Sequence, residues 1–139
     1  MMGLTRKAEY AIRGMLFLAK QHNGNPKLLD AVAVAVDAPK PFLAKIFQDL
    51  SNKGLIKSVR GAGGGFTLVR APEFITLCDI VEAIEGPIMP NQCLMEEGIC
   101  SLQKACTVHP VWRRLQQVTK GILQEVSLAS LVGWGEAAP

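Results

Sequence analysis

The stretch PKPFLAKIFQDLSNKGLIKSVRGAGGGFTLVR, residues 39–70, decides the fold that we expect for this chain. Its first part predicts a helix over residues 39–54, because prolines suit the first turn of a helix and Gly54 suits the position just after the last. One face of that helix is apolar at three- and four-residue steps, through Phe42, Leu43, Ile46, Phe47 and Leu50. The second part predicts a β-hairpin over residues 55–70, because two short alternating segments flank the turn RGAGGG.

Two further helices are expected before this stretch. Residues 4–21 carry apolar side chains at helical spacing, and Thr5 is placed to cap the N-terminus of that helix. Residues 28–38 are harder to assign, since their alternating Ala and Val favour a strand by propensity, yet none of residues 31–36 is polar. Because this segment lies between two helices with short links, we predict a short helix.

Helix, short helix, helix and two-stranded wing is the order of a winged helix-turn-helix, here over residues 1–70. In that module the third helix enters the major groove of DNA, and side chains near its N-terminus reach the base edges. The side chains in those places are Lys40, Ala44, Lys45 and Gln48. A slim wing with arginine at its base suits a narrow minor groove, which makes Arg60, Gly61 and Gly63 the wing candidates. The alternative interpretation is an ordinary solvated helix face.

The charge distribution also favours a polyanionic partner. Residues 1–70 hold 11 basic and 4 acidic residues, a net charge of +7, whereas residues 71–139 hold 4 basic and 8 acidic residues, a net charge of −4. A basic half joined to an acidic half suggests that one end of the chain meets nucleic acid. A solvated basic surface would give the same asymmetry.

Composition excludes several other classes of protein. Hydrophobic residues make up 49% of the 139 residues and charged residues 19%, which argues against disorder. No apolar run reaches the ~18 residues of a membrane-spanning helix, and charged side chains interrupt the N-terminal segment where a signal peptide would need an apolar core. We therefore expect a cytoplasmic protein with reduced thiols. The glycine run lacks the pattern of a phosphate-binding loop, and nothing implies enzyme activity.

The second half of the chain, residues 71–139, is expected to hold a cysteine loop and a dimerisation helix. Residues 75–86 predict an amphipathic helix with Thr76 as its N-cap, in which Cys78 is interpreted as a packing residue. Residues 109–126 predict the longest helix, with an apolar seam formed by Val111, Leu115, Val118, Ile122 and Val126. Little of so short a chain is left to cover that seam, so we expect a homodimer, the alternative being that the helix folds back onto the N-terminal helices.

Between those two helices lies CLMEEGICSLQKACTVH, residues 93–109, with the spacing C-x6-C-x5-C-x2-H. A structural zinc site usually contains two cysteines two to four residues apart, and this loop has no such pair. Three widely spaced thiols with one nitrogen or oxygen ligand suit an iron–sulfur cluster. A cysteine protease is excluded, because the only other histidine, His22, lies at a helix end. A thiol-redox switch without a cluster stays open as the rival interpretation.

Four segments carry a resemblance to a known family: LTRKAEYAIRGMLFLA, FLAKIFQDLSNKGLIKSVRGAGGGF, the cysteine loop and HPVWRRL. Together they resemble the bacterial winged helix-turn-helix transcription regulators of the IscR/NsrR type, which are dimers, many of them carrying a [2Fe-2S] or [4Fe-4S] cluster. The resemblance implies that Cys93, Cys100 and Cys106 are cluster thiolates and that His109 is the fourth ligand. It also implies an alternative fourth ligand, Glu9, since nitric-oxide-sensing members use an acidic residue from the first helix of the other protomer.

Between these two candidates we favour His109, because it follows Cys106 by three residues and because imidazole suits cluster iron better than carboxylate does. We also favour [2Fe-2S] over [4Fe-4S]. Two departures from IscR bear on the signal and the target. The first cysteine gap is six residues rather than five, and Ala44 stands where IscR carries a glutamate that reads bases.

The sequence therefore predicts a mainly α fold, a winged helix-turn-helix followed by a long C-terminal dimerisation helix. The predicted function is that of a cytoplasmic, homodimeric transcription regulator that binds double-stranded operator DNA and is controlled by an iron–sulfur cluster. The loop is expected beside the DNA-binding half, where cluster gain or loss would change the angle between two recognition helices. The alternatives are a cluster-free thiol-redox or cysteine-responsive repressor of the same fold, and an iron–sulfur electron carrier.

Overall fold

The computed structural model describes residues 3–95 and 101–135 of the chain. The helices are α1 (Arg6–Lys20), α2 (Leu29–Val36), α3 (Lys40–Asn52), α4 (Leu77–Glu85), α5 (His109–Glu125) and α6 (Leu128–Trp134), and the strands are β1 (Ile56–Val59) and β2 (Gly65–Leu68). Short 3-10 turns are η1 (Pro72–Phe74), η2 (Gln92–Leu94) and η3 (Gln103–Ala105). The predicted mainly helical fold with a two-stranded wing and a long C-terminal helix is confirmed.

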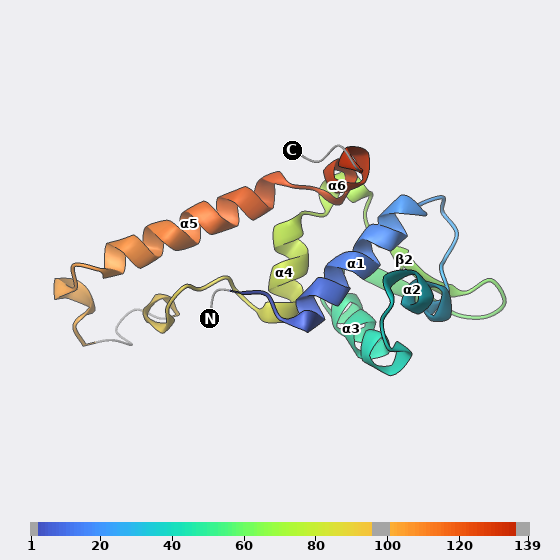
Figure 1. The fold of residues 1–139 in the computed structure, drawn as a ribbon, viewed down its shortest axis with the longest axis horizontal. Helices are drawn as coiled ribbons and strands as arrows, with labels where there is room; N and C mark the ends of the chain where they lie inside the picture. Colours follow the sequence, from blue (N-terminus) through green and yellow to red (C-terminus); the bar gives the residue numbers. More distant parts are fainter. Residues whose placement is uncertain (1–2, 96–100, 136–139) are drawn as a thin grey trace.

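The molecule consists of a body and an arm (Figure 1). The body contains α1–α4, α6 and the two-stranded sheet, with α2, α3 and the wing gathered at the end opposite to the arm. The arm, residues 86–95 and 101–125, consists of the extended segment after α4, the described part of the cysteine loop and α5. The protein therefore separates its winged helix from its cysteine loop in space.

The starts and ends of the helices follow the expected local chemistry. The Thr5 hydroxyl accepts a hydrogen bond from the Ala8 N–H at 3.2 Å, and Thr76 forms a reciprocal capping box with Asp79 at the start of α4. Gly54, just after α3, adopts a φ of +76°, a left-handed conformation that costs glycine little. These observations confirm the two predicted N-caps and the predicted stop after α3.

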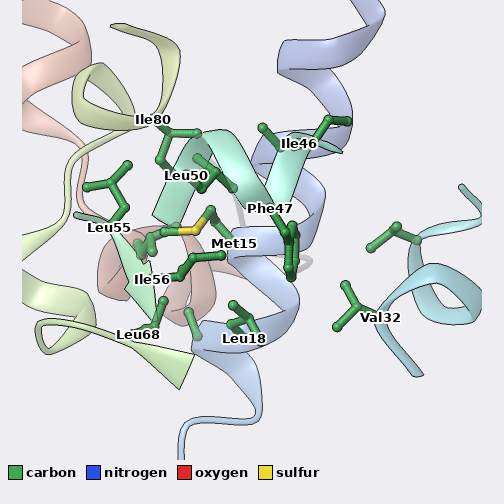
Figure 2. Packing of buried hydrophobic residues seen from close by; sticks show 14 of the residues in the cluster. Met15, Leu18, Val32, Ile46, Phe47, Leu50, Leu55, Ile56, Leu68 and Ile80 are labelled. Carbon is green, nitrogen blue, oxygen red and sulfur yellow. The ribbon is translucent and has the colours of Figure 1, made fainter. Parts of the chain in front are cut away.

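The predicted apolar stripe of α3 forms the centre of the core. Leu43, Ile46, Phe47 and Leu50 are fully buried, and they pack against α1, α2, α4 and the sheet (Figure 2). The Phe47 ring also meets the Phe66 ring edge to face, with 5.1 Å between the ring centroids. The third helix is thus fixed by its inward face, which leaves the opposite face free for recognition.

Gly14 of α1 makes the closest packing against this stripe. A Cβ atom at Gly14 would lie 2.7 Å from Cε1 of Phe47, a distance shorter than carbon–carbon contact allows. The glycine therefore permits α1 and the Phe47 ring of α3 to approach each other closely.

The wing pairs β1 and β2 antiparallel, with Ile56 opposite Leu68 and Val59 opposite Gly65. Lys27 adds an isolated bridge to the sheet, because its N–H and carbonyl exchange hydrogen bonds with Phe66 at 2.8 and 2.7 Å. Gly65 lies against that bridge, so that a Cβ atom there would stand 2.3 Å from the Lys27 carbonyl oxygen. The sequence predicted the hairpin but not this third segment.

The segment over residues 28–38 is helical, as predicted, and forms α2. Val32, Ala33 and Val36 face the core. Leu28 and Val34 are instead 61% and 84% exposed. The segment therefore exposes apolar side chains where an amphipathic helix would carry polar ones. The helix ends at Asp37, whose φ of +54° is left-handed.

The C-terminal helix α6 is an α-helix that the sequence did not predict. Ser127 caps it by accepting a hydrogen bond from the Ser130 N–H at 3.0 Å, and Leu128 is fully buried in the core. The residues before it pair with the start of α4: Leu77 N–H donates to Val126 O at 2.8 Å and Leu128 N–H donates to Ile75 O at 2.9 Å. We call this pairing the clamp, because it closes the body where the arm returns.

Candidate nucleic-acid interface and cysteine loop

The outward face of α3 presents the predicted base-reading side chains. Lys45 and Gln48 are exposed and Ala44 is half-buried. Gln48 donates a hydrogen bond from Nε2 to Asn52 Oδ1 at 3.2 Å, which orients its amide along the helix surface. Gln48 retains the carbonyl oxygen of this amide as an acceptor.

Lys40 occupies the N-terminus of α3, and its Nζ lies 2.7 Å from Asp30 Oδ1 of α2. Both side chains are mostly exposed, so this ion pair contributes at most about 1 kcal/mol to stability. A phosphate could therefore replace Asp30 as the partner of Lys40. Sequence reasoning missed Asp30 because it lies ten residues away on a different helix.

The wing tip has the slim profile that was predicted for it. Arg60, Gly61 and Gly63 are exposed, and no atom of the described residues lies within 4 Å of a Cβ atom built at either glycine. Both glycines adopt left-handed φ values, +93° and +75°, which shape the tight turn. Gly64 differs, because a Cβ atom there would stand 2.3 Å from the Val59 carbonyl oxygen, so its role is structural.

The arm carries the cysteine loop away from α3 and the wing (Figure 1). Cys93 lies in η2, Cys106 follows η3, and His109 is the first residue of α5. Cys100, the remaining predicted thiolate, lies outside the described residues. The loop was expected beside the DNA-binding half; within one chain its described part lies apart from α3 and the wing, because the segment after α4 runs outward and α5 runs back to the body (Figure 1).

The structure brings two of the predicted ligands together. Nδ1 of His109 lies 3.3 Å from Sγ of Cys93, although 16 residues separate them in the sequence. His109 is only 6% exposed, and its Nε2 lies 3.2 Å from a guanidinium nitrogen of Arg113. Glu9, the alternative ligand, is exposed on α1 in the body. Across residues 3–95 and 101–135, no three metal-binding side chains lie together.

Cys78 is buried in α4, as its interpretation as a packing residue predicted. Burial raises the pKa of its thiol to about 11, and the nearby Glu82 carboxylate adds to the shift. Its Sγ lies 3.5 Å from Glu82 Oε1, and Glu82 also pairs with Lys120 of α5 at 3.1 Å. This thiol is in an environment that disfavours the reactive thiolate.

Cys78 should therefore be the slowest of the four cysteines to be alkylated. With a pKa of about 11, roughly one thiol in a thousand is ionised at pH 8, and the fraction rises as the pH approaches that value. Iodoacetamide labelling of the native, metal-free protein, followed by mass spectrometry, measures each site. Faster labelling of Cys78 than of Cys93 or Cys106 would contradict the packing role.

Comparison with known proteins places this geometry in a family. The model of the Rrf2 family, described as an iron-dependent transcriptional regulator, matches residues 4–133. The chain belongs to the Rrf2 family. Within residues 3–95 and 101–135, no helix is both long enough and apolar enough to cross a membrane.

Similar proteins include two kinds of Rrf2 regulator. The chain is 32% identical to CymR of Bacillus subtilis over 133 residues, covering 96% of this chain and 91% of CymR. It is 31% identical to IscR of Erwinia tasmaniensis over 131 residues, covering 94% of this chain and 79% of IscR. Both are named as HTH-type transcriptional regulators.

The solved Rrf2 structures show the same two kinds. The structure of CymR, described as the global cysteine regulator of B. subtilis, matches with a TM-score of 0.77 at 31% identity and covers 96% of this chain and 98% of CymR. That of T. potens IscR matches with a TM-score of 0.75 at 28% identity and covers 99% and 91%. The fold is thus that of Rrf2 regulators.

Proposed function

We propose that this Rrf2 protein is a homodimeric repressor or activator whose affinity for operator DNA is set by an iron–sulfur cluster. The observation that carries the proposal is the 3.3 Å approach of Cys93 Sγ and His109 Nδ1. A thiol and an imidazole, far apart in sequence, meet at the end of the arm. IscR is among the relatives of this chain, which agrees with such a site.

The donor set fits the cluster. Thiolate and imidazole are soft or intermediate ligands that suit iron–sulfur centres. Cys93, Cys100, Cys106 and His109 would hold the cluster, with [2Fe-2S] favoured over [4Fe-4S]. Cys93 and Cys106 are half-buried, so solvent and small molecules reach the site. When bound, the cluster would supply a chemical sensor of iron–sulfur, redox or nitric oxide status.

The proposed homodimer would form through the apolar seam of α5. Val111, Val118 and Ile122 of the predicted seam are 56%, 49% and 59% exposed along α5. Apolar side chains at this spacing are typical of a helix that packs against a second helix. Because His109 begins the same helix, a change at the cysteine loop would reach the dimer through α5. It would then alter the spacing of the two recognition helices.

The DNA-binding part of this proposal predicts a salt-dependent defect. Lys45→Ala and Arg60→Ala should each weaken operator binding, and loss of one phosphate contact should lower the salt slope by about 1. The measurement is fluorescence anisotropy of a labelled operator fragment at several salt concentrations. Lys104→Ala is the matched control, because Lys104 is exposed on the arm. Unchanged binding in both test variants would remove the winged helix from this role.

The choice of fourth ligand gives another prediction. His109→Ala should change the visible spectrum of the cluster and loosen the cluster, because the imidazole beside Cys93 is lost. Glu9→Ala should have little effect, because its carboxylate is exposed on the body. Absorbance spectra of both variants after anaerobic reconstitution test this. If Glu9→Ala alters the spectrum and His109→Ala does not, the fourth ligand is the carboxylate of Glu9 from the other protomer.

A cluster-free regulator of the same fold is the second candidate. It is favoured by the similarity to CymR, named a global cysteine regulator, and by the contact between thiol and imidazole, which also suits a reversible thiol switch. Anaerobic purification followed by iron and sulfide analysis, absorbance and Mössbauer spectra separates the two candidates. Iron-free protein that still binds operator in response to thiol oxidation would support the second. A cluster in a protein that does not shift operator DNA would instead indicate an electron carrier.

A further inference from the structure

The two described ring contacts of His109 favour one tautomer of its imidazole. The Arg113 guanidinium lies 3.2 Å from His109 Nε2, and a guanidinium can only donate hydrogen bonds. A hydrogen bond from Arg113 requires Nε2 to accept, and the neutral imidazole then carries its proton on Nδ1. Nδ1 faces Sγ of Cys93 at 3.3 Å, so in this tautomer it donates toward the sulfur.

Arg113 can keep this contact because of its position on the helix. It lies four residues after His109 on α5, so the two side chains share one face of the helix. His109 is buried, whereas Arg113 is exposed. The guanidinium can therefore leave the imidazole and enter solvent without a change in the helix.

We propose that Arg113 is a positioning residue that competes with metal for His109, an inference that rests on the proposed function. Ligation through Nε2 needs the lone pair that Arg113 occupies. Ligation through Nδ1 needs the proton on Nε2, which then faces a second donor, the guanidinium. With either nitrogen as ligand, Arg113 must withdraw before the imidazole can bind the metal.

Release of Arg113 would also change the surface of the dimerisation helix. The freed guanidinium extends from the first turns of α5 on the face that carries His109, whereas Val111, two residues before Arg113, lies on the other side of the helix. When metal is bound, the positively charged guanidinium of Arg113 would leave the imidazole of His109 and extend into solvent beside α5. Occupancy of the site would thus change the charge exposed on α5, on the face away from the proposed seam.

The test compares Arg113→Met with wild type and with Arg114→Met, the adjacent exposed arginine, as matched control. First, ¹⁵N NMR of the histidine side chains in the metal-free protein reports the tautomer of His109. Second, titration with Co²⁺ alone, followed by its thiolate and ligand-field absorption bands, reports metal affinity. Co²⁺ is chosen because its binding does not depend on assembly of iron and sulfide into a cluster.

The expected result is that only Arg113→Met shifts His109 toward the Nε2-protonated tautomer. The same variant should bind Co²⁺ roughly three- to tenfold more tightly than wild type, the range for losing one partly exposed charge-assisted hydrogen bond. An unchanged tautomer, unchanged or weaker Co²⁺ binding, equal effects in Arg114→Met, or no thiolate band in wild type would each overturn the inference. Failure of iron and sulfide to assemble would overturn the proposed function alone.

Discussion

Ile122→Asp is expected to turn the dimer into a monomer and to weaken operator binding by at least about a hundredfold. Ile122 is 59% exposed in one chain, and the seam to which it belongs continues along α5 through Val118 and Val111. A carboxylate at this place would be buried without a partner in the dimer, which typically costs 3 kcal/mol or more. Loss of the second half-site contact removes an avidity gain of about 10² to 10⁴.

Sedimentation velocity and operator titration measure the two consequences of this substitution. Gln117→Asp is the matched control, because it places the same charge on an exposed part of α5 away from the seam. The control should remain dimeric and bind operator as wild type does. A wild-type protein that sediments as a monomer, or an Ile122→Asp protein that stays dimeric, would contradict the proposed role of the seam.

Gly14→Val is expected to destabilise the body by about 3 kcal/mol, the upper range for overpacking a core. The added Cβ would start 2.7 Å from the Phe47 ring, and Phe47 is itself fully buried and held by Phe66. Since domains of this size are stable by only about 5–15 kcal/mol, this is a large part of the total. Because Phe47 belongs to α3, operator binding should fall with stability.

Gly133→Val provides the comparison for a helical glycine with open space. Among residues 3–95 and 101–135, nothing lies within 4 Å of a Cβ atom at Gly133 in α6, so the substitution should be neutral or slightly stabilising through helix propensity. Urea unfolding followed by circular dichroism measures both variants. Equal free energies of unfolding for the two variants would contradict the close packing of Gly14 against Phe47.

Local patterns were sufficient to predict most of the winged helix. The apolar stripe of α3, the capping threonines and the glycine run act through nearest neighbours in sequence, so periodicity and cap chemistry reveal them. The helix α6 was missed because LASLVGW is short and shows no polar face. It is stabilised mainly by packing of Leu128 in a core built by distant segments, which no local pattern encodes.

For the cysteine loop too, the sequence predicted residue types but not the contacts between distant segments. Spacing singled out the cysteines and His109 as candidates, because residue type alone indicates ligand chemistry. It could not show that Cys93 meets His109, since that contact depends on how the arm folds back along α5. Nor could it single out Arg113, which in sequence is an ordinary charged residue on a helix. The close approach at Gly14 is likewise a property of two helices together.

The clamp has a consequence for how this architecture can diversify. Backbone hydrogen bonds join residues 75–77 to residues 126–128, so the chain after the arm is fixed to the body at the start of α4, whereas the arm leaves the body at the end of that helix. The entropy of closing a loop grows only with the logarithm of its length, and doubling the length costs about 0.6 kcal/mol. Insertions, deletions or replaced ligands within the arm therefore disturb the winged helix little. The same winged helix can therefore be combined with different sensory loops. Chimeras joined at the clamp should yield regulators that respond to other signals.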